Sequence, residues 1–163
     1  VDLRVEDQRA LDEVDAYDRA VFLFDAFGLM PDGDNLEILR RVHRALRPGG
    51  MLCLDVRNRD WIARAMPPTT VLQRGDAYMI DRHQLDTATG RLVDHRVIVR
   101  GGVARETPFS IRVYTLSEIS LMLSLTGFAL RAAWGSWQGD APALHRNRLV
   151  VFAERVLAPH APR

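Results

Sequence analysis

Several groups of residues have types suited to catalysis or metal binding, but their spacing does not fit the chemistry. Residues 32–35 read Asp-Gly-Asp-Asn, yet a calcium loop needs an oxygen ligand at its fifth position and glycine at its sixth, where Leu36 and Glu37 stand. The five histidines lie far apart, with no cysteine or acidic residue at zinc-ligand spacing. Residues 135–139 read Gly-Ser-Trp-Gln-Gly, whereas a nucleophile elbow has serine in the middle. We therefore expect neither a metal site nor a serine hydrolase.

The strongest structural signal is a pair of short apolar runs, residues 21–24 and 51–56. Both are too short for helices, and such runs are typical of parallel strands buried on both faces. Between them, residues 35–47 place apolar side chains at helical spacing, with Asp34 as the expected N-cap and the Pro-Gly-Gly of residues 48–50 as the stop. The pattern predicts a right-handed parallel strand–helix–strand crossover.

Ligands of open α/β sheets bind outside the carboxyl ends of the strands. Leu23, Phe24 and Asp25 end the first predicted strand and are the expected ligand contacts. Asn58 and Trp61 follow the second strand and are expected near the same cleft. For Trp61 a second interpretation stays open, in which its ring fixes a short helix onto the sheet.

From residue 70 to residue 114 the apolar pattern changes to a period of two, which predicts an antiparallel insert within a single domain of residues 1–163. Residues 78–85 and 92–100 form the expected hairpin, with 86–90 as its turn. Thr115 and Glu118 then have capping-box spacing at the start of a helix. Two terminal strands are expected at 128–134 and 148–154.

An ordered set of short motifs runs along the chain: Asp7-Gln8-Arg9, Tyr17-Asp18, Leu23-Phe24, Phe27-Gly28, Asp34-Asn35-Leu36, Arg-Ala-Leu-Arg-Pro-Gly-Gly at 44–50, Asp-Val-Arg-Asn-Arg at 55–59, and Arg112 to Glu118. This set resembles the class I S-adenosylmethionine-dependent methyltransferases, in particular a branch of small bacterial enzymes. The resemblance implies a partial Rossmann-like α/β sheet, mostly parallel, with antiparallel terminal strands and an antiparallel β insert. It also implies S-adenosylmethionine as the cofactor.

The resemblance assigns roles to particular residues. It implies that Asp7 and Gln8 meet the adenine, and that Leu23, Phe24 and Asp25 complete the cofactor contacts. For Asp7 the alternative is a solvated loop carboxylate. Because related enzymes cover their active site with such an insert, the remaining side chains at the cleft are expected to contact the acceptor substrate; they are Asn58, Trp61, Arg112 and Trp137.

Methyl transfer needs a general base only when the acceptor atom carries a proton. His83 and Tyr114, both in or beside the insert, are the candidate catalytic residues. For His83 an exposed strand histidine is the alternative. The reaction implied is methyl transfer to nitrogen or oxygen of a small molecule.

One departure from the family pattern limits this interpretation. The glycine-rich turn after the family's first strand and the acidic residue ending its second strand have no counterpart here. Leu3 and Val5 alternate with charged residues, which predicts a strand over residues 1–6, and residues 1–5 resemble the family's third strand. The two strand–helix units without a counterpart correspond to ~60 residues. We expect the chain to represent the C-terminal two-thirds of such an enzyme. An alternative is a non-catalytic remnant that acts through homodimerisation, and a lesser one is a nucleic-acid methyltransferase with arginines 40, 41, 44 and 47 on one helix face.

Composition narrows the class of protein. Apolar residues make up 47% of the 163 residues and charged residues 26%, as in ordinary globular domains. A net charge of +1 argues against nucleic acid as a partner. The single cysteine, Cys53, suits a reducing cytoplasm, and no apolar run approaches the ~18 residues of a membrane span. These features predict a cytoplasmic protein, and the resemblance implies a bacterial one.

Overall fold

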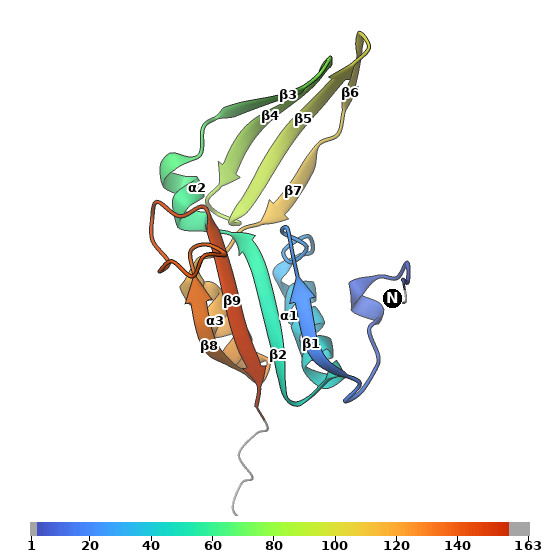
Figure 1. Cartoon of the computed structure of the whole chain (residues 1–163), viewed down its shortest axis with the longest axis vertical. Helices are drawn as coiled ribbons and strands as arrows, with labels where there is room; N and C mark the ends of the chain where they lie inside the picture. Colours follow the sequence, from blue (N-terminus) through green and yellow to red (C-terminus); the bar gives the residue numbers. More distant parts are fainter. Residues whose placement is uncertain (1–2, 157–163) are drawn as a thin grey trace, which may run out of the picture.

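A computed structural model describes residues 3–156 of the chain, and it contains two sheets (Figure 1). The core sheet has the strand order β1 (Tyr17–Phe22), β2 (Leu46–Arg57), β9 (Arg148–Arg155) and β8 (Phe128–Trp134). β1 and β2 are parallel, whereas β2–β9 and β8–β9 are antiparallel. The predicted α/β fold class is confirmed, although the described part of the sheet is mixed rather than mostly parallel.

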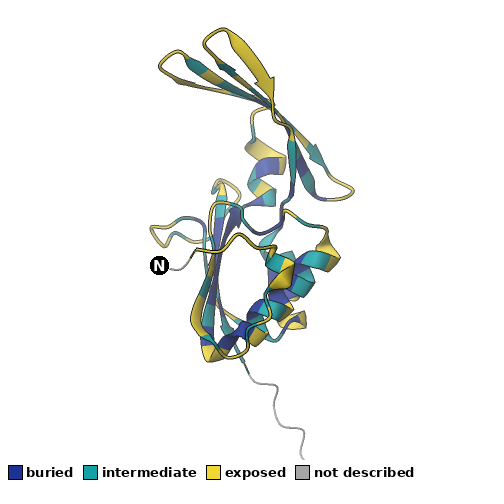
Figure 2. Cartoon of the chain, turned by 90° about the vertical axis from the view of Figure 1, so that its right-hand side faces the viewer, coloured by how far each residue is buried: buried dark blue, intermediate teal, exposed yellow. Residues whose placement is uncertain are grey.

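Two helices, α1 (Asp32–Ala45) and α3 (Leu116–Leu125), cover the same face of the core sheet (Figure 2). α1 buries Ile38, Leu39 and Val42 at helical spacing against the apolar residues of β2 and β9. The predicted parallel pairing of β1 and β2, with α1 between them in the chain, is confirmed. So is the capping box of α3, formed by Thr115 and Glu118.

The ends of α1 differ from the prediction. The helix begins at Asp32 with Pro31 as N-cap, rather than at Asp34, and the Asp32 carboxylate accepts a hydrogen bond from the Tyr114 hydroxyl at 2.9 Å. β2 already begins at Leu46, so the predicted Pro-Gly-Gly stop belongs to this strand. Leu46 pairs with Tyr17, and a register shift before Arg19 takes up the extra residues as a bulge.

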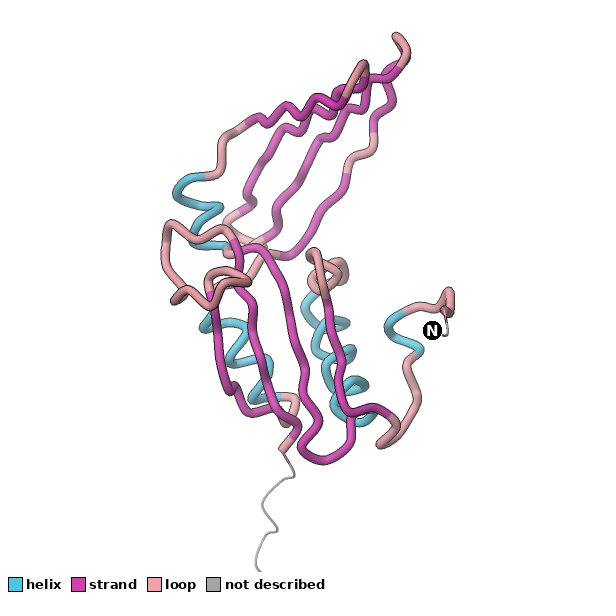
Figure 3. Tube along the Cα trace, viewed as in Figure 1, coloured by secondary structure: helices cyan, strands magenta, loops and turns pink. Residues whose placement is uncertain are grey.

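The insert forms a second, antiparallel sheet (Figure 3). Its strands are β3 (Thr69–Arg74), β4 (Ala77–Asp86), β5 (Arg91–Arg100), β6 (Val103–Glu106) and β7 (Phe109–Arg112). The predicted hairpin is confirmed as β4 and β5, but the insert has five strands rather than about three. At the junction with the core, α2 (Arg59–Ala65) packs Ile62 against Leu92 and Ile111. This small apolar cluster fixes the base of the insert.

The N-terminal segment corrects two predictions. Residues 3–6 form no strand, because no neighbouring strand among residues 3–156 pairs with them; residues 1 and 2 of that prediction lie outside the described part. A short 3-10 helix, η1 (Gln8–Ala10), follows. The run at 21–24 was expected to be buried on both faces, but β1 is an edge strand that ends at Phe22, and Val21 is 62% exposed. Between residues 3 and 156, no helix is long and apolar enough to cross a membrane.

Candidate functional site

The loop that follows β1 lies at the carboxyl edge of the core sheet and has an unusual backbone. Phe24 and Asp25 have φ angles of 54° and 64°, in the left-handed region. The side chain of Asp55, at the end of β2, accepts from the Phe24 amide at 3.2 Å, and its carbonyl accepts from the Asp25 amide at 3.2 Å. These bonds hold Phe24 with 86% of its surface exposed and Leu23 beside it half-exposed.

Asp7 and Gln8 approach this loop from the N-terminal side. The Gln8 side-chain amide donates to the carbonyl of Ala26 at 3.4 Å. Asp7 caps η1, and hydrogen bonds from the Arg9 guanidinium lower the pKa of its carboxyl group to about 2. A cavity of about 250 Å³ lies between η1 and the core, with Asp7, Gln8 and Phe22 in its lining. The structure therefore places Gln8 in contact with the loop after β1, and it places Asp7 next to Gln8 in the lining of the same cavity.

A chain of ion pairs runs from this edge of the core into the insert. Arg148 donates to Asp55 Oδ1 at 2.8 Å and to Asp25 Oδ1 at 2.9 Å. Arg57 donates to the second oxygen of Asp25 at 3.0 Å, and its Nη1 lies 3.5 Å from Asp94 Oδ2 on β5. We call this series, Asp55–Arg148–Asp25–Arg57–Asp94, the ion-pair chain. It joins the loop after β1 to the buried Asp94 of the insert.

Asp94 also holds His83, its cross-strand neighbour on β4. Asp94 Oδ1 lies 2.5 Å from His83 Nδ1, and Thr70 Oγ1 on β3 lies 3.0 Å from His83 Nε2. Two cross-strand pairs further toward the tip of the sheet, Arg96 donates to Asp81 at 2.7 and 2.8 Å, which lowers the pKa of the Asp81 carboxyl group. The histidine is thus a buried member of a polar layer, rather than an exposed strand residue.

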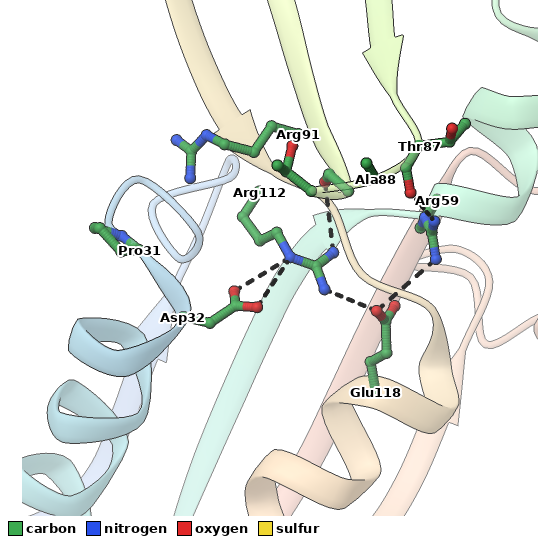
Figure 4. A pocket seen from close by; sticks show the side chains of 10 residues that line it. Pro31, Asp32, Arg59, Thr87, Ala88, Arg91, Arg112 and Glu118 are labelled. Atoms are coloured by element: carbon green, nitrogen blue, oxygen red, sulfur yellow. Dashed lines mark hydrogen bonds and ion pairs between the residues drawn. The ribbon is translucent and has the colours of Figure 1, made fainter.

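Tyr114 and Arg112 lie together in a different cluster, and Figure 4 shows the surroundings of Arg112. Arg112 lies between Asp32 of α1 and Glu118 of α3, and its guanidinium stacks on the Tyr114 ring at 4.4 Å. Arg112, Asp32 and Glu118 line a cavity of about 670 Å³, together with Arg59 and Arg91, whereas Tyr114 is buried and does not line it. Burial and the negative charge of Asp32 raise the pKa of the Tyr114 hydroxyl. Through these contacts, Arg112 and Tyr114 connect the end of the insert to helices α1 and α3 of the core.

The other predicted substrate residues are spread around the junction. Asn58 is the N-cap of α2, and its side-chain amide donates to the carbonyls of Ala143 and Arg146. Trp61 is partly buried against the Ile62 cluster, as the packing interpretation expected. Trp137 is half-exposed in the loop between β8 and β9. None of the three is hydrogen-bonded through its side chain to the ion-pair chain in the described structure.

We expect Tyr114→Phe to lower the free energy of unfolding by about 1–3 kcal/mol, because Asp32 and the buried Asn35 each lose a hydrogen-bond partner. Since the pKa of Tyr114 is raised in the folded state, its contribution is present below about pH 10 and is lost as the pH rises further. Denaturant unfolding at pH 7 and pH 11 measures both effects. Tyr17→Phe, at a half-exposed hydroxyl bonded to Glu13, is the control. Equal stability of the two variants would contradict a stabilising role for the hydrogen bonds of the Tyr114 hydroxyl.

The chain's sequence matches no protein-family model and no curated protein. Solved structures are similar to it. The methyltransferase CcbJ from Streptomyces caelestis matches 94% of this chain and 63% of its own, with a TM-score of 0.82 and 17% identity. An S-adenosylmethionine-dependent methyltransferase from Clostridium acetobutylicum matches 94% and 64%, with a TM-score of 0.82 and 12% identity.

The chain has part of the class I methyltransferase fold. A third structure agrees: CalS10 from Micromonospora echinaspora, an amino pentose methyltransferase solved with S-adenosylmethionine bound, matches 93% of this chain and 63% of its own, with a TM-score of 0.61 and 16% identity. The chain thus spans less than two thirds of the length of these three methyltransferases, and its fold is the one that the sequence resemblance implied.

Proposed function

We propose that the protein transfers a methyl group from S-adenosylmethionine to nitrogen or oxygen of a small molecule, and that this chain supplies the acceptor side of the site. The observation that carries the proposal is the ion-pair chain, which joins the loop of Phe24 and Asp25 to His83 within the methyltransferase fold. The similar structures include CalS10, an amino pentose methyltransferase, and KedS8, a sugar N-methyltransferase from Streptoalloteichus.

The residues at the carboxyl edge fit one end of the cofactor. Leu23 and Phe24 present exposed apolar surface, on which an adenine ring can pack. Asp7 is ionised near neutral pH, and its Oδ2, which accepts from Arg9, has a second lone pair that can accept from an exocyclic amine. When bound, the cofactor brings a methyl group already activated on a sulfonium sulfur.

The chain's own contribution to the chemistry would be to orient the acceptor and receive its proton. An ionised Asp94 can only accept hydrogen bonds, so the His83 nitrogen beside it carries the hydrogen. In a neutral imidazole the other nitrogen is then an acceptor, and the Thr70 hydroxyl donates to it. Holding the acceptor in line with the methyl group can lower the activation barrier by ~7–11 kcal/mol. A rigid polar layer that orients the acceptor would therefore speed the reaction even if no proton were transferred to it.

We expect S-adenosylhomocysteine to bind the chain in a calorimetric titration, and Phe24→Ala to weaken binding about fivefold through lost ring packing. Asp7→Ala should weaken it similarly, whereas His83→Ala should reduce turnover with little change in cofactor affinity. Tyr78→Ala, at another exposed aromatic residue on the insert, is the control. Unchanged affinity in both the Phe24 and Asp7 variants would refute the site.

A second hypothesis is that the protein is non-catalytic and associates with itself, and the unpaired outer edge of β1 favours it. Among residues 3–156 no strand pairs with the outer side of β1, and Val21 is exposed there. A concentration-dependent dimer without S-adenosylhomocysteine binding would favour this reading. Nucleic acid is disfavoured as a partner, because Arg40 and Arg41 pair with Glu37, and Arg47 pairs with Asp18.

A further inference from the structure

The cavity of about 670 Å³ at the junction of core and insert has an excess of positive charge in its lining. Three arginines line it, Arg59, Arg91 and Arg112, against two acidic residues, Asp32 and Glu118, so the lining carries a net charge of +1. We call it the arginine cavity. In the view of Figure 4, Arg112 lies between the other two arginines. The volume is within the range of ligand pockets, roughly 300–1,000 Å³.

Arg112 binds both of the acidic residues. Its Nε lies 3.2 Å from Asp32, and its Nη2 lies 2.7 Å from Glu118. The Arg112 side chain is 10% exposed, and it is therefore committed to these contacts. The positive charge in excess belongs to the two arginines on either side.

Arg59 has most of its hydrogen-bond donors free. Its Nη2 donates to the Thr87 carbonyl at 3.3 Å, whereas its Nη1 lies 3.8 Å from Glu118, which is too far for a hydrogen bond. A guanidinium carries five N–H groups, so this single bond leaves four without an acceptor among residues 3–156. The side chain is 27% exposed, so a ligand can reach these donors.

Arg91 adds a charge that no acidic residue neutralises. It donates to the Ser110 hydroxyl and to the carbonyls of Leu29, Met30 and Ser110, all of which are neutral. No carboxylate in the described part of the chain lies within 4.0 Å of it, although the residue is half-buried. A partly desolvated cation of this kind favours an anion nearby, and it disfavours a cationic ligand.

We propose that the arginine cavity binds the carboxylate or phosphate group of a small molecule, with Arg59 as the anion-binding residue. The planar fork of a guanidinium matches two oxygens of such a group. Thr87 lines both the arginine cavity and a second cavity that His83 lines, so a molecule held by Arg59 can extend toward His83. That this molecule is the methyl acceptor rests on the proposed function, whereas its binding does not.

The test is an amide NMR titration of the chain with benzoate, phenyl phosphate and benzamide. Benzoate should bind at least about fivefold more tightly than benzamide, because a charged acceptor forms the stronger hydrogen bond with a guanidinium. The amide signals of residues 87–90 should move on binding. Either ranking of benzoate and phenyl phosphate supports the site and identifies the oxyanion that it prefers. Equal binding of benzoate and benzamide, or unmoved signals at residues 87–90, would overturn the proposal.

Two matched variants locate the anion. Arg59→Gln should weaken benzoate binding at least about fivefold and remove the preference over benzamide. Arg64→Gln removes the same charge from an exposed residue of the same helix outside the lining, and it should leave binding unchanged. Arg59→Lys keeps the charge without the planar fork, so its benzoate affinity should fall between those of Arg59→Gln and the unsubstituted chain. Equal effects of Arg59→Gln and Arg64→Gln would overturn the location.

The two proposals fail separately. Benzoate binding that is sensitive to Arg59→Gln, in a chain that does not bind S-adenosylhomocysteine, supports the arginine cavity and counts against the methyltransferase function. Cofactor binding without a preference for benzoate over benzamide overturns the arginine cavity alone. Arg59→Gln should leave the affinity for S-adenosylhomocysteine unchanged, and a loss would mean that the cavity holds the cofactor's carboxylate instead of the acceptor.

Discussion

Asparagine in place of Asp94 is expected to lower the free energy of unfolding by about 2–4 kcal/mol. Asp94 is fully buried and connects two partners, since it lies 2.5 Å from His83 Nδ1 and 3.5 Å from Arg57 Nη1. Asparagine keeps the shape but removes the charge that both partners face. Arg57 would then be left half-buried with Asp25 as its remaining ion-pair partner.

The matched control is Asp18→Asn, which breaks an ion pair of ordinary length, 2.8 Å to Arg47, where the Asp18 side chain is 70% exposed. Water replaces such a surface pair at little cost, so a change below about 1 kcal/mol is expected. Equilibrium unfolding in urea at pH 7 measures both variants. If Asp94→Asn is no less stable than Asp18→Asn, the ion-pair chain does not hold the insert to the core.

The crossover from β1 to β2 and the α3 capping box could be predicted because their signals are local. Apolar spacing marks the inner face of α1, and the Thr115–Glu118 pair marks the start of α3. The start of α1 was misplaced because Asp34 has the sequence of an N-cap, whereas Asp32 is held by Tyr114, 82 residues away. The residues around a helix N-terminus give no information about a hydrogen-bond partner so far away in the sequence.

The same distinction applies to the site. The His83–Asp94 pair follows from the hairpin register once Asp86 is set opposite Arg91, so the sequence contained a usable signal for it. The bond between Arg148 and Asp25 joins residues 123 positions apart, and no periodicity links them. Residues 3–6 show the converse, since an alternating pattern predicts a strand only where another strand is present to pair with it.

Gly28→Ala is expected to lower the free energy of unfolding by about 2–4 kcal/mol. Gly28 has a φ of 102°, and a Cβ atom at this position would lie 2.4 Å from the Arg112 carbonyl oxygen. The Arg112 amide also donates to the Gly28 carbonyl at 2.8 Å, so the neighbouring backbone cannot withdraw without losing a bond. The loop after β1 and the last strand of the insert are therefore in direct backbone contact, and alanine would force them apart.

Gly33→Ala gives the control for Gly28→Ala on the same segment of the chain. Gly33 lies in the first turn of α1, and a Cβ atom there would meet nothing within 4 Å. Alanine at that position should stabilise the helix by about 0.5–1 kcal/mol, opposite in sign to the Gly28 effect. Urea midpoints of the two variants measure the difference.

Because Gly28 closes the loop that carries Phe24, a destabilised Gly28→Ala should also lose S-adenosylhomocysteine affinity, whereas Gly33→Ala should retain it. Similar urea midpoints for the two variants would show that the loop accommodates a Cβ atom at Gly28 without loss of stability. The contact between Gly28 and β7 would then not be needed to position the site.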